Sequence, residues 1–91
     1  MIPYGRQEID QSDIDTVVSC LRSEYLTQGP LVEVFEAKVC TFTKSKFATS
    51  VTSATSALHL ACLGMGVGPD DEVWVSAISF VSSANCARFC G

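Results

Sequence analysis

Two short apolar runs, each followed by an apolar segment of helical length, constrain this chain more than any other feature. KFATSV precedes TSALHLACLGMG, and DDEVWVSA precedes SFVSSANCARFC. The order strand, helix, strand, helix is typical of a parallel sheet in an α/β layer. We therefore predict strands at 46–51 and 72–76 and helices at about 55–65 and 80–90. In such a layer the ligand site lies beyond the carboxyl ends of the strands.

The residues before the first predicted strand have the pattern of two helices. Apolar residues recur at helical spacing from Ile14 to Leu21, and we predict a helix over about 13–23 with Ser12 as its N-cap. The segment SEYLTQGP breaks this pattern, and Pro30 suits the first turn of a following helix.

Length, composition and charge limit the class of protein. The 91 residues allow one small domain, with a helical segment over 1–45 and a strand–helix–strand–helix segment over 46–91. With 47% hydrophobic and 18% charged residues the chain is too apolar for a disordered tail. No apolar run approaches the roughly 20 residues that cross a bilayer. The net charge of −4 and the scattered bases argue against nucleic acid. We expect a soluble, cytoplasmic protein, because MIPYGRQEID has no apolar signal region.

The five cysteines show no metal-binding spacing. Their number is odd, no CxxC pair occurs, and most fall on apolar helical positions where a free thiol acts as a small hydrophobe. Cys86 and Cys90 share a helix face, but the single histidine, His59, belongs to another predicted helix. We therefore expect no structural zinc, and we interpret His59 as an interior residue.

Four hydroxyl side chains crowd around the end of the first predicted strand: Thr52, Ser53, Thr55 and Ser56. One interpretation is that Ser53 or Thr55 caps the following helix. The other is a phosphate site, because a helix N-terminus has unpaired N–H groups and a partial positive charge, and small Ala54 allows close approach. Four hydroxyls are more than a cap requires.

The remaining motifs are less specific. GMGVGPDD does not have the dinucleotide-binding spacing and follows a helix, so we interpret it as a helix end and a turn. Phe80, at the end of the second predicted strand, is either a core residue or a ring placed to stack on a planar ligand. A single histidine does not supply a hydrolase triad.

Five blocks of sequence carry a resemblance to a known family: IPYGRQEID, LTQGPLVEVFE, SATSALHLA, GPDDEV and ISFVSSANC. In this order they resemble the N-terminal part of the pyridoxal-phosphate-dependent sugar aminotransferases of the DegT/DnrJ/EryC1/StrS type. The resemblance implies an incomplete portion of the large domain of a fold type I, aspartate-aminotransferase-like transferase, which acts as a homodimer. Ser53-Ala54-Thr55 with Ile78-Ser79-Phe80 is similar to the branch of pseudaminic acid biosynthesis. That branch transfers an amino group from glutamate to C4 of a UDP-linked 4-keto-6-deoxy-N-acetylhexosamine.

The same resemblance assigns roles to individual residues. It implies that Thr55 and Ser56, with Ala54 beside them, hold the phosphate of pyridoxal 5'-phosphate, and that Phe80 stacks on its ring. Residues near the sugar nucleotide would be Tyr4, Thr27 and Gln28. Two positions depart from the family pattern, with Thr52 in place of a common asparagine and Ala77 in place of a common proline.

The resemblance also implies chemistry for which these residues have no group. The family's Schiff-base lysine and the carboxylate that keeps the pyridine nitrogen protonated come beyond position 91. Lys44 precedes the first predicted strand and Lys46 begins it, which places both at the opposite end of the sheet from Thr55. We therefore expect this chain alone to lack transaminase activity.

Two hypotheses of different classes follow. The chain is either part of a longer aminotransferase or a non-catalytic remnant that binds a phosphate or a partner surface. In both cases the two predicted strands lack the neighbours that the family's sheet supplies. We expect self-association or loose packing of the isolated chain.

Overall fold

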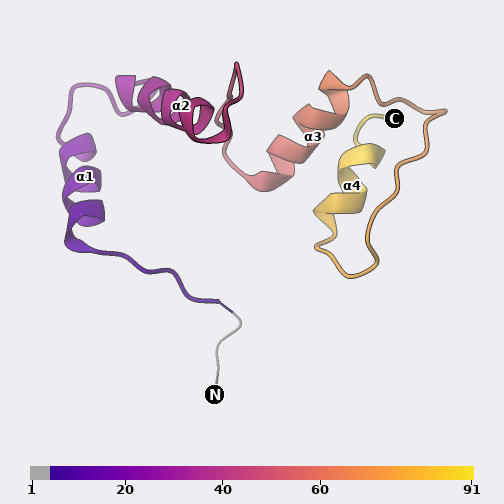
Figure 1. Cartoon of the computed structure of the whole chain (residues 1–91), viewed down its shortest axis with the longest axis horizontal. Helices are drawn as coiled ribbons and strands as arrows, with labels where there is room; N and C mark the ends of the chain where they lie inside the picture. Colours follow the sequence, from indigo (N-terminus) through magenta and orange to yellow (C-terminus); the bar gives the residue numbers. More distant parts are fainter. Residues whose placement is uncertain (1–4) are drawn as a thin grey trace. The chain divides into compact units, whose positions relative to one another are not determined.

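The computed structural model describes residues 5–91, so Tyr4 lies outside the described residues. The described residues contain four helices (Figure 1). The chain divides into a first unit, Met1–Ala48, and a second unit, Thr49–Gly91. The helices are α1 (Gln11–Leu21), α2 (Pro30–Thr43), α3 (Ala54–Gly64) and α4 (Ser82–Arg88).

Helix α1 is held at its N-terminus by a reciprocal pair of carboxylates. Asp10 is the N-cap, and its Oδ1 accepts the N–H of Asp13 at 3.1 Å, while Oδ2 of Asp13 accepts the N–H of Asp10 at 3.1 Å. The predicted N-cap, Ser12, is wrong. Its hydroxyl donates to Oδ1 of Asp10 at 2.7 Å instead, so the helix begins two residues earlier than the apolar pattern indicated.

Helix α2 begins at Pro30, as predicted, because the fixed backbone angle of proline suits the first turn. The preceding turn depends on Gly29. A Cβ at this position would lie 3.0 Å from the carbonyl oxygen of Tyr25, so a side chain does not fit without a shift of the backbone. Gln28 has the left-handed φ of 52°, and Lys44 ends the helix with a φ of 59°.

In the second unit α3 packs against α4. Both helices begin at the lower end of the pair in Figure 1, so they run in the same direction. The buried residues of this pair are Cys62 from α3 with Ser82 and Cys86 from α4. Helix α3 agrees with its predicted range, and Gly66, with a φ of 77°, turns the chain after it.

The predicted strands are not formed in residues 5–91. Neither 46–51 nor 72–76 has strand structure, and Trp74 is 93% exposed. A strand is defined by its hydrogen bonds to a neighbouring strand, and neither segment makes such bonds within residues 5–91. The sheet of the predicted α/β layer is therefore unconfirmed. Helix α4 is shorter than predicted, because Phe80 and Val81 precede it.

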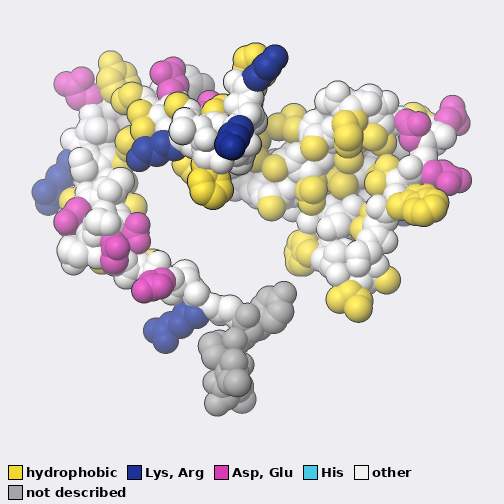
Figure 2. All heavy atoms as spheres, viewed as in Figure 1, with side chains coloured by type: hydrophobic (Ala, Val, Ile, Leu, Met, Phe, Trp, Pro, Cys, Tyr) yellow, Lys and Arg dark blue, Asp and Glu magenta, His cyan; other side chains and the backbone are white. Residues whose placement is uncertain are grey.

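Apolar side chains lie at the surface of both units (Figure 2). The exposed large hydrophobic residues include Phe42, Phe47, Trp74, Ile78 and Phe80. Such exposure is far above that of an ordinary monomeric domain, so the described residues have a small core and much uncovered apolar area. None of the helices in residues 5–91 has the length and apolar character needed to span a membrane.

Candidate phosphate-binding site

The turn into α3 is fixed by Ser53. This residue is the N-cap, and its Oγ accepts the N–H of Ser56 at 3.2 Å and lies 3.1 Å from Oγ of Ser56. The capping interpretation is therefore confirmed for Ser53, whereas Thr55 lies inside the first turn and is not the cap.

The cap leaves several polar groups at this end of α3 without a partner. Among the described residues, the N–H groups of Ala54 and Thr55 have no acceptor, and the hydroxyls of Thr52 and Thr55 make no hydrogen bond. Thr55 and Ser56 are half-buried, and the first turn carries no acidic residue. These donors are suited to an anion that has more than one oxygen.

In the second unit, the N-terminus of α3 is the main source of positive potential for an anion. Its only basic side chain is Arg88, which lies in the last turn of α4, and its acids are Asp70, Asp71 and Glu72. The field of an exposed helix N-terminus stabilises an anion by about 0.3–1 kcal/mol. Hydrogen bonds to a charged group contribute about 1.5–3 kcal/mol each. The direct donors, above all Thr55, therefore matter more than the helix dipole.

Phe80 lies at the end of a loop that is ordered by serine side chains. The hydroxyl of Ser79 donates to the carbonyl of Ser76 at 2.8 Å, and Oγ of Ser76 accepts the N–H of Ile78 at 3.3 Å. The carbonyl of Phe80 accepts the N–H of Ser83 at 3.0 Å, which joins the loop to α4. The side chain of Phe80 is 75% exposed, so it is not a core residue in this structure and one face is available to a planar ligand.

These groups fit one part of pyridoxal 5'-phosphate. The donors at the start of α3 suit the phosphate, and an exposed ring suits the pyridine, whereas the second unit contains no lysine. Lys38, Lys44 and Lys46 all belong to the first unit. The second unit therefore contains the residues predicted to bind the cofactor, and it contains no lysine to provide the amine that the chemistry needs.

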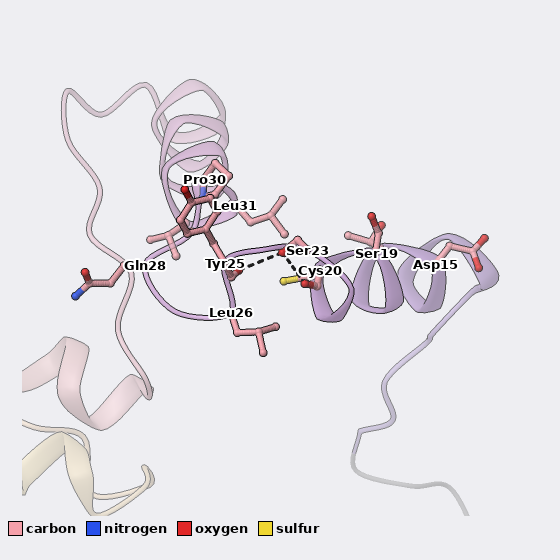
Figure 3. A pocket seen from close by; sticks show the side chains of 12 residues that line it. Asp15, Ser19, Cys20, Ser23, Tyr25, Leu26, Gln28, Pro30 and Leu31 are labelled. Atoms are coloured by element: carbon pink, nitrogen blue, oxygen red, sulfur yellow. Dashed lines mark hydrogen bonds between the residues drawn. The ribbon is translucent and has the colours of Figure 1, made fainter.

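The remaining predicted residues, Thr27 and Gln28, lie in the first unit. They belong to the turn between α1 and α2, beside an open hollow of ≈ 580 Å³. Gln28 lines this hollow, but its side chain points away from the other labelled side chains in Figure 3. Ala54, Thr55 and Ser56 are consecutive residues in the first turn of α3, whereas Thr27 and Gln28 belong to the other unit.

The hollow also contains residues that sequence reasoning missed. The hydroxyl of Ser23 donates to the carbonyl of Cys20 at 2.7 Å and lies 3.2 Å from the carbonyl of Tyr25 (Figure 3). Tyr25 lies close to Gly29, in the place where a side chain at position 29 would be. The available signal in the sequence was Gly29, four residues after Tyr25. It indicated a turn but did not indicate a hollow beside that turn.

His59 agrees with its interpretation as an interior residue. It is half-buried, and its ring meets that of Phe89 edge-on at a centroid distance of 5.5 Å. No group of three or more His, Cys, Asp or Glu side chains within residues 5–91 is arranged to hold a metal ion.

Comparisons with known proteins give the chain its relatives. The family model described as the DegT/DnrJ/EryC1/StrS aminotransferase family matches residues 7–91. The UDP-4-amino-4,6-dideoxy-N-acetyl-beta-L-altrosamine transaminase of Campylobacter jejuni is 43% identical over the whole chain, which covers 24% of that protein.

Two further relatives come from other bacteria. The UDP-4-amino-4-deoxy-L-arabinose–oxoglutarate aminotransferase of Shewanella sediminis is 37% identical over 99% of the chain and 23% of that protein. The spore coat polysaccharide biosynthesis protein SpsC of Bacillus subtilis is 40% identical over 92% of the chain and 22% of that protein. The chain thus spans about a quarter of the length of these relatives. No solved structure matches it.

Proposed function

The chain belongs to the DegT/DnrJ/EryC1/StrS aminotransferase family, and from this premise we propose that it is the phosphate-holding N-terminal part of a pyridoxal-phosphate-dependent sugar-nucleotide aminotransferase. The cofactor, when bound, supplies an electron sink for the transfer of an amino group. The observation that carries the proposal is the set of unpartnered donors of Ala54 and Thr55 at the start of α3.

In this proposal the residues of α3 bind and orient, and they move no proton. The N–H groups of Ala54 and Thr55 and the hydroxyls of Thr55 and Ser56 replace the water around a phosphate dianion. Ser53 keeps these donors in place because its cap bond to Ser56 fixes the first turn. The absence of a side chain beyond Cβ in Ala54 leaves the backbone accessible.

Phe80 has the second binding role. Its exposed ring would lie against the pyridine ring and exclude water from one face. Thr27 and Gln28, with Tyr4, are proposed to contact the sugar nucleotide. From the resemblance to the pseudaminic acid branch of the family, we propose that the substrate is a UDP-linked 4-keto-6-deoxy-N-acetylhexosamine and that glutamate is the amino donor. We also propose that the intact enzyme is a cytoplasmic homodimer.

A chimera tests this function directly. The quarter of the Campylobacter transaminase that the chain matches is replaced by residues 1–91 of this chain. We expect the chimera to bind pyridoxal 5'-phosphate and to transfer an amino group to the sugar nucleotide of that enzyme. A matched chimera with Thr55→Val and Ser56→Ala should have weaker cofactor binding. A folded chimera that binds pyridoxal and pyridoxal 5'-phosphate equally would refute the phosphate role.

The alternative is a phosphate-binding or interaction module without catalysis. The observation that favours it is the absence of lysine from the second unit, which contains the phosphate donors. This alternative predicts that the chimera binds inorganic phosphate through Thr55 but has no transaminase activity. An active chimera would exclude it.

A further inference from the structure

The direction in which the ring of Phe80 projects depends on its backbone. The side chain is 75% exposed, and the ring contact found within residues 5–91 joins His59 to Phe89 and does not include it. With little packing around the ring, the direction of the Cα–Cβ bond decides which region the ring can reach. The segments on either side of Phe80 therefore determine whether the ring can lie against a planar ligand.

On its C-terminal side, Phe80 is tied to α4. Its carbonyl oxygen accepts the N–H of Ser83 at 3.0 Å. Helix α4 packs on α3, the helix that carries the proposed phosphate donors. This side of Phe80 is therefore connected to the phosphate donors through a packed pair of helices.

On its N-terminal side, Phe80 follows a loop that one short hydrogen bond closes. The hydroxyl of Ser79 donates to the carbonyl oxygen of Ser76 at 2.8 Å. The bond from the N–H of Ile78 to Oγ of Ser76 is longer, at 3.3 Å. Residues 71–80 are all exposed, so the shape of the loop depends on its own hydrogen bonds. The Ser79 bond is the shorter of these two constraints, and it is made by the residue next to Phe80.

We propose that Ser79 is a positioning residue for Phe80. Its bond to the carbonyl of Ser76 fixes the backbone from which the ring projects, before the cofactor binds. This inference rests on the proposed function, in which Phe80 lies against the pyridine ring. A binding group that is already ordered loses less conformational freedom when the ligand binds. Losing the Ser79 bond should therefore weaken the affinity for the ring of the cofactor and leave the affinity for its phosphate unchanged.

Two ligands measure the ring and the phosphate separately. Pyridoxal has the ring without the phosphate, inorganic phosphate has no ring, and each is titrated into the cofactor-free chimera. Ser79→Ala removes the hydroxyl donor, and we expect pyridoxal to bind about 2–10-fold more weakly, which corresponds to the loss of one hydrogen bond. The affinity for inorganic phosphate should stay unchanged, which also shows that the second unit of the variant is folded.

Two matched variants test whether the hydroxyl bond is responsible. Ser79→Thr keeps a hydroxyl donor at the same position, so it should restore the parent affinity for pyridoxal. Ser83→Ala removes a hydroxyl that makes no hydrogen bond within residues 5–91, and the backbone bonds of residue 83 remain. It should leave both affinities unchanged.

A double variant distinguishes positioning from a general structural role. In a Phe80→Leu background, Ser79→Ala should cause no further loss of pyridoxal affinity, because the ring through which Ser79 acts is gone. A further loss in that background, an equal loss of phosphate affinity, or a loss that Ser79→Thr does not restore would overturn the positioning role.

The Phe80→Leu variant also separates this inference from the proposed function. If Phe80→Leu weakens pyridoxal binding and Ser79→Ala does not, Ser79 has no positioning role and the proposed function stands. If Phe80→Leu leaves pyridoxal binding unchanged, the proposed role of Phe80 is wrong, and the inference about Ser79 is wrong with it.

Discussion

The two units form their helices by different means. In the first unit α1 and α2 contain no buried residue, and their ends are fixed by neighbours in the sequence, namely the paired carboxylates of Asp10 and Asp13 and the proline at the start of α2. In the second unit α3 and α4 pack on each other and bury Cys62 and Cys86. Local signals thus start helices in both units, and in the second unit the packing of α3 on α4 adds to them.

This difference explains where the candidate site lies. A phosphate site needs donors that stay in place when no ligand is bound. The first turn of α3 has a cap from Ser53 and a helix body held by α4, whereas α1 has a cap and no packed face. Short helices in water are marginally stable without packing, so we expect the second unit to keep its geometry better than the first.

The largest expected effect concerns association of the chain. Because both units expose large apolar side chains, we predict that the isolated chain self-associates or is poorly packed at micromolar concentration. The second unit should contribute most, because Trp74 and Ile78 are 93% and 95% exposed beside an unpaired extended segment. Sedimentation should show a lower mass for Trp74→Lys with Ile78→Lys than for the matched double variant Phe42→Lys with Phe47→Lys in the first unit.

A sharp near-UV circular dichroism signal from Trp74 in a monomer that unfolds cooperatively would contradict this prediction. It would show that the second unit covers its apolar surface without a partner.

The next effect in size concerns Thr55. In the chimera, Thr55→Val should weaken the affinity for pyridoxal 5'-phosphate by about 1.5–3 kcal/mol, the range for a hydrogen bond to a charged group. The control is Thr41→Val in the first unit, whose hydroxyl donates to the carbonyl of Ala37 at 2.9 Å and is remote in sequence from the donors of α3. Titrating each cofactor-free chimera with pyridoxal 5'-phosphate measures the affinities of the two variants. Equal affinities would reduce Thr55 to an ordinary first-turn residue.

Removing the N-cap of α1 and that of α3 compares the stability of the helices in the two units directly. Asp10→Ala and Ser53→Ala each remove a cap that typically contributes about 0.5–2 kcal/mol. We expect α1 to lose most of its helical population, because it buries no residue, and α3 to keep most of its own, because it packs on α4. Backbone chemical shifts of 11–21 and 54–64 report the two helices separately. A similar loss in both helices would show that the α3–α4 contact adds little stability.

The smallest effects are those of pH, and they have opposite directions in the two units. Hydrogen bonds from the Ser12 hydroxyl and the Asp13 N–H lower the pKa of Asp10. The stability that Asp10 gives α1 is therefore present above the ordinary aspartate pKa of about 3.9. It is lost as the pH falls through the lowered value. In the second unit burial raises the pKa of Cys62. Its contribution is therefore complete below the ordinary thiol pKa of about 8.5. It is lost as the pH rises towards the folded value.

Chemical shifts followed from acid to alkaline pH test both signs. Acid should reduce the helicity of α1 before that of α3, and alkali should loosen the α3–α4 pair before α1. Cys62→Ala is the control that removes the alkaline effect, and Asp10→Asn removes the acid effect while keeping a capping side chain. A reversed order would contradict the assignment of these groups.

The sequence predicted what depends on near neighbours. Helix α3, the start of α2 at Pro30, the cap by Ser53 and the interior position of His59 all follow from spacing and side-chain type. The resemblance to the family also came from ordered blocks and is confirmed. Ser12 was mistaken for the cap of α1 because four polar residues, 10–13, precede its apolar stripe, and only the side-chain geometry shows that Asp10 makes the cap bond.

The predicted strands illustrate what near neighbours do not determine. The apolar run at 72–76 has the composition of a buried strand, yet its backbone hydrogen bonds need another chain segment beside it. Residues 5–91 do not provide that segment. The exposure of Phe80 has the same origin, because a ring at the end of an unformed strand has no layer to cover it. The roles of Thr55, Ser56 and Phe80 stay predictions.

The common direction of α3 and α4 sets the distance that the chain segment between them must cover. Two helices that begin at the same end require the chain to travel back along the whole length of α3, which is about 16 Å for its 11 residues. An extended run of five residues covers about 16–17 Å, which is the length of the apolar run at 72–76. The run at 72–76 is therefore long enough to cover the return path that the direction of the two helices requires. A neighbouring strand would then supply the backbone hydrogen bonds that the segment at 72–76 does not make within residues 5–91.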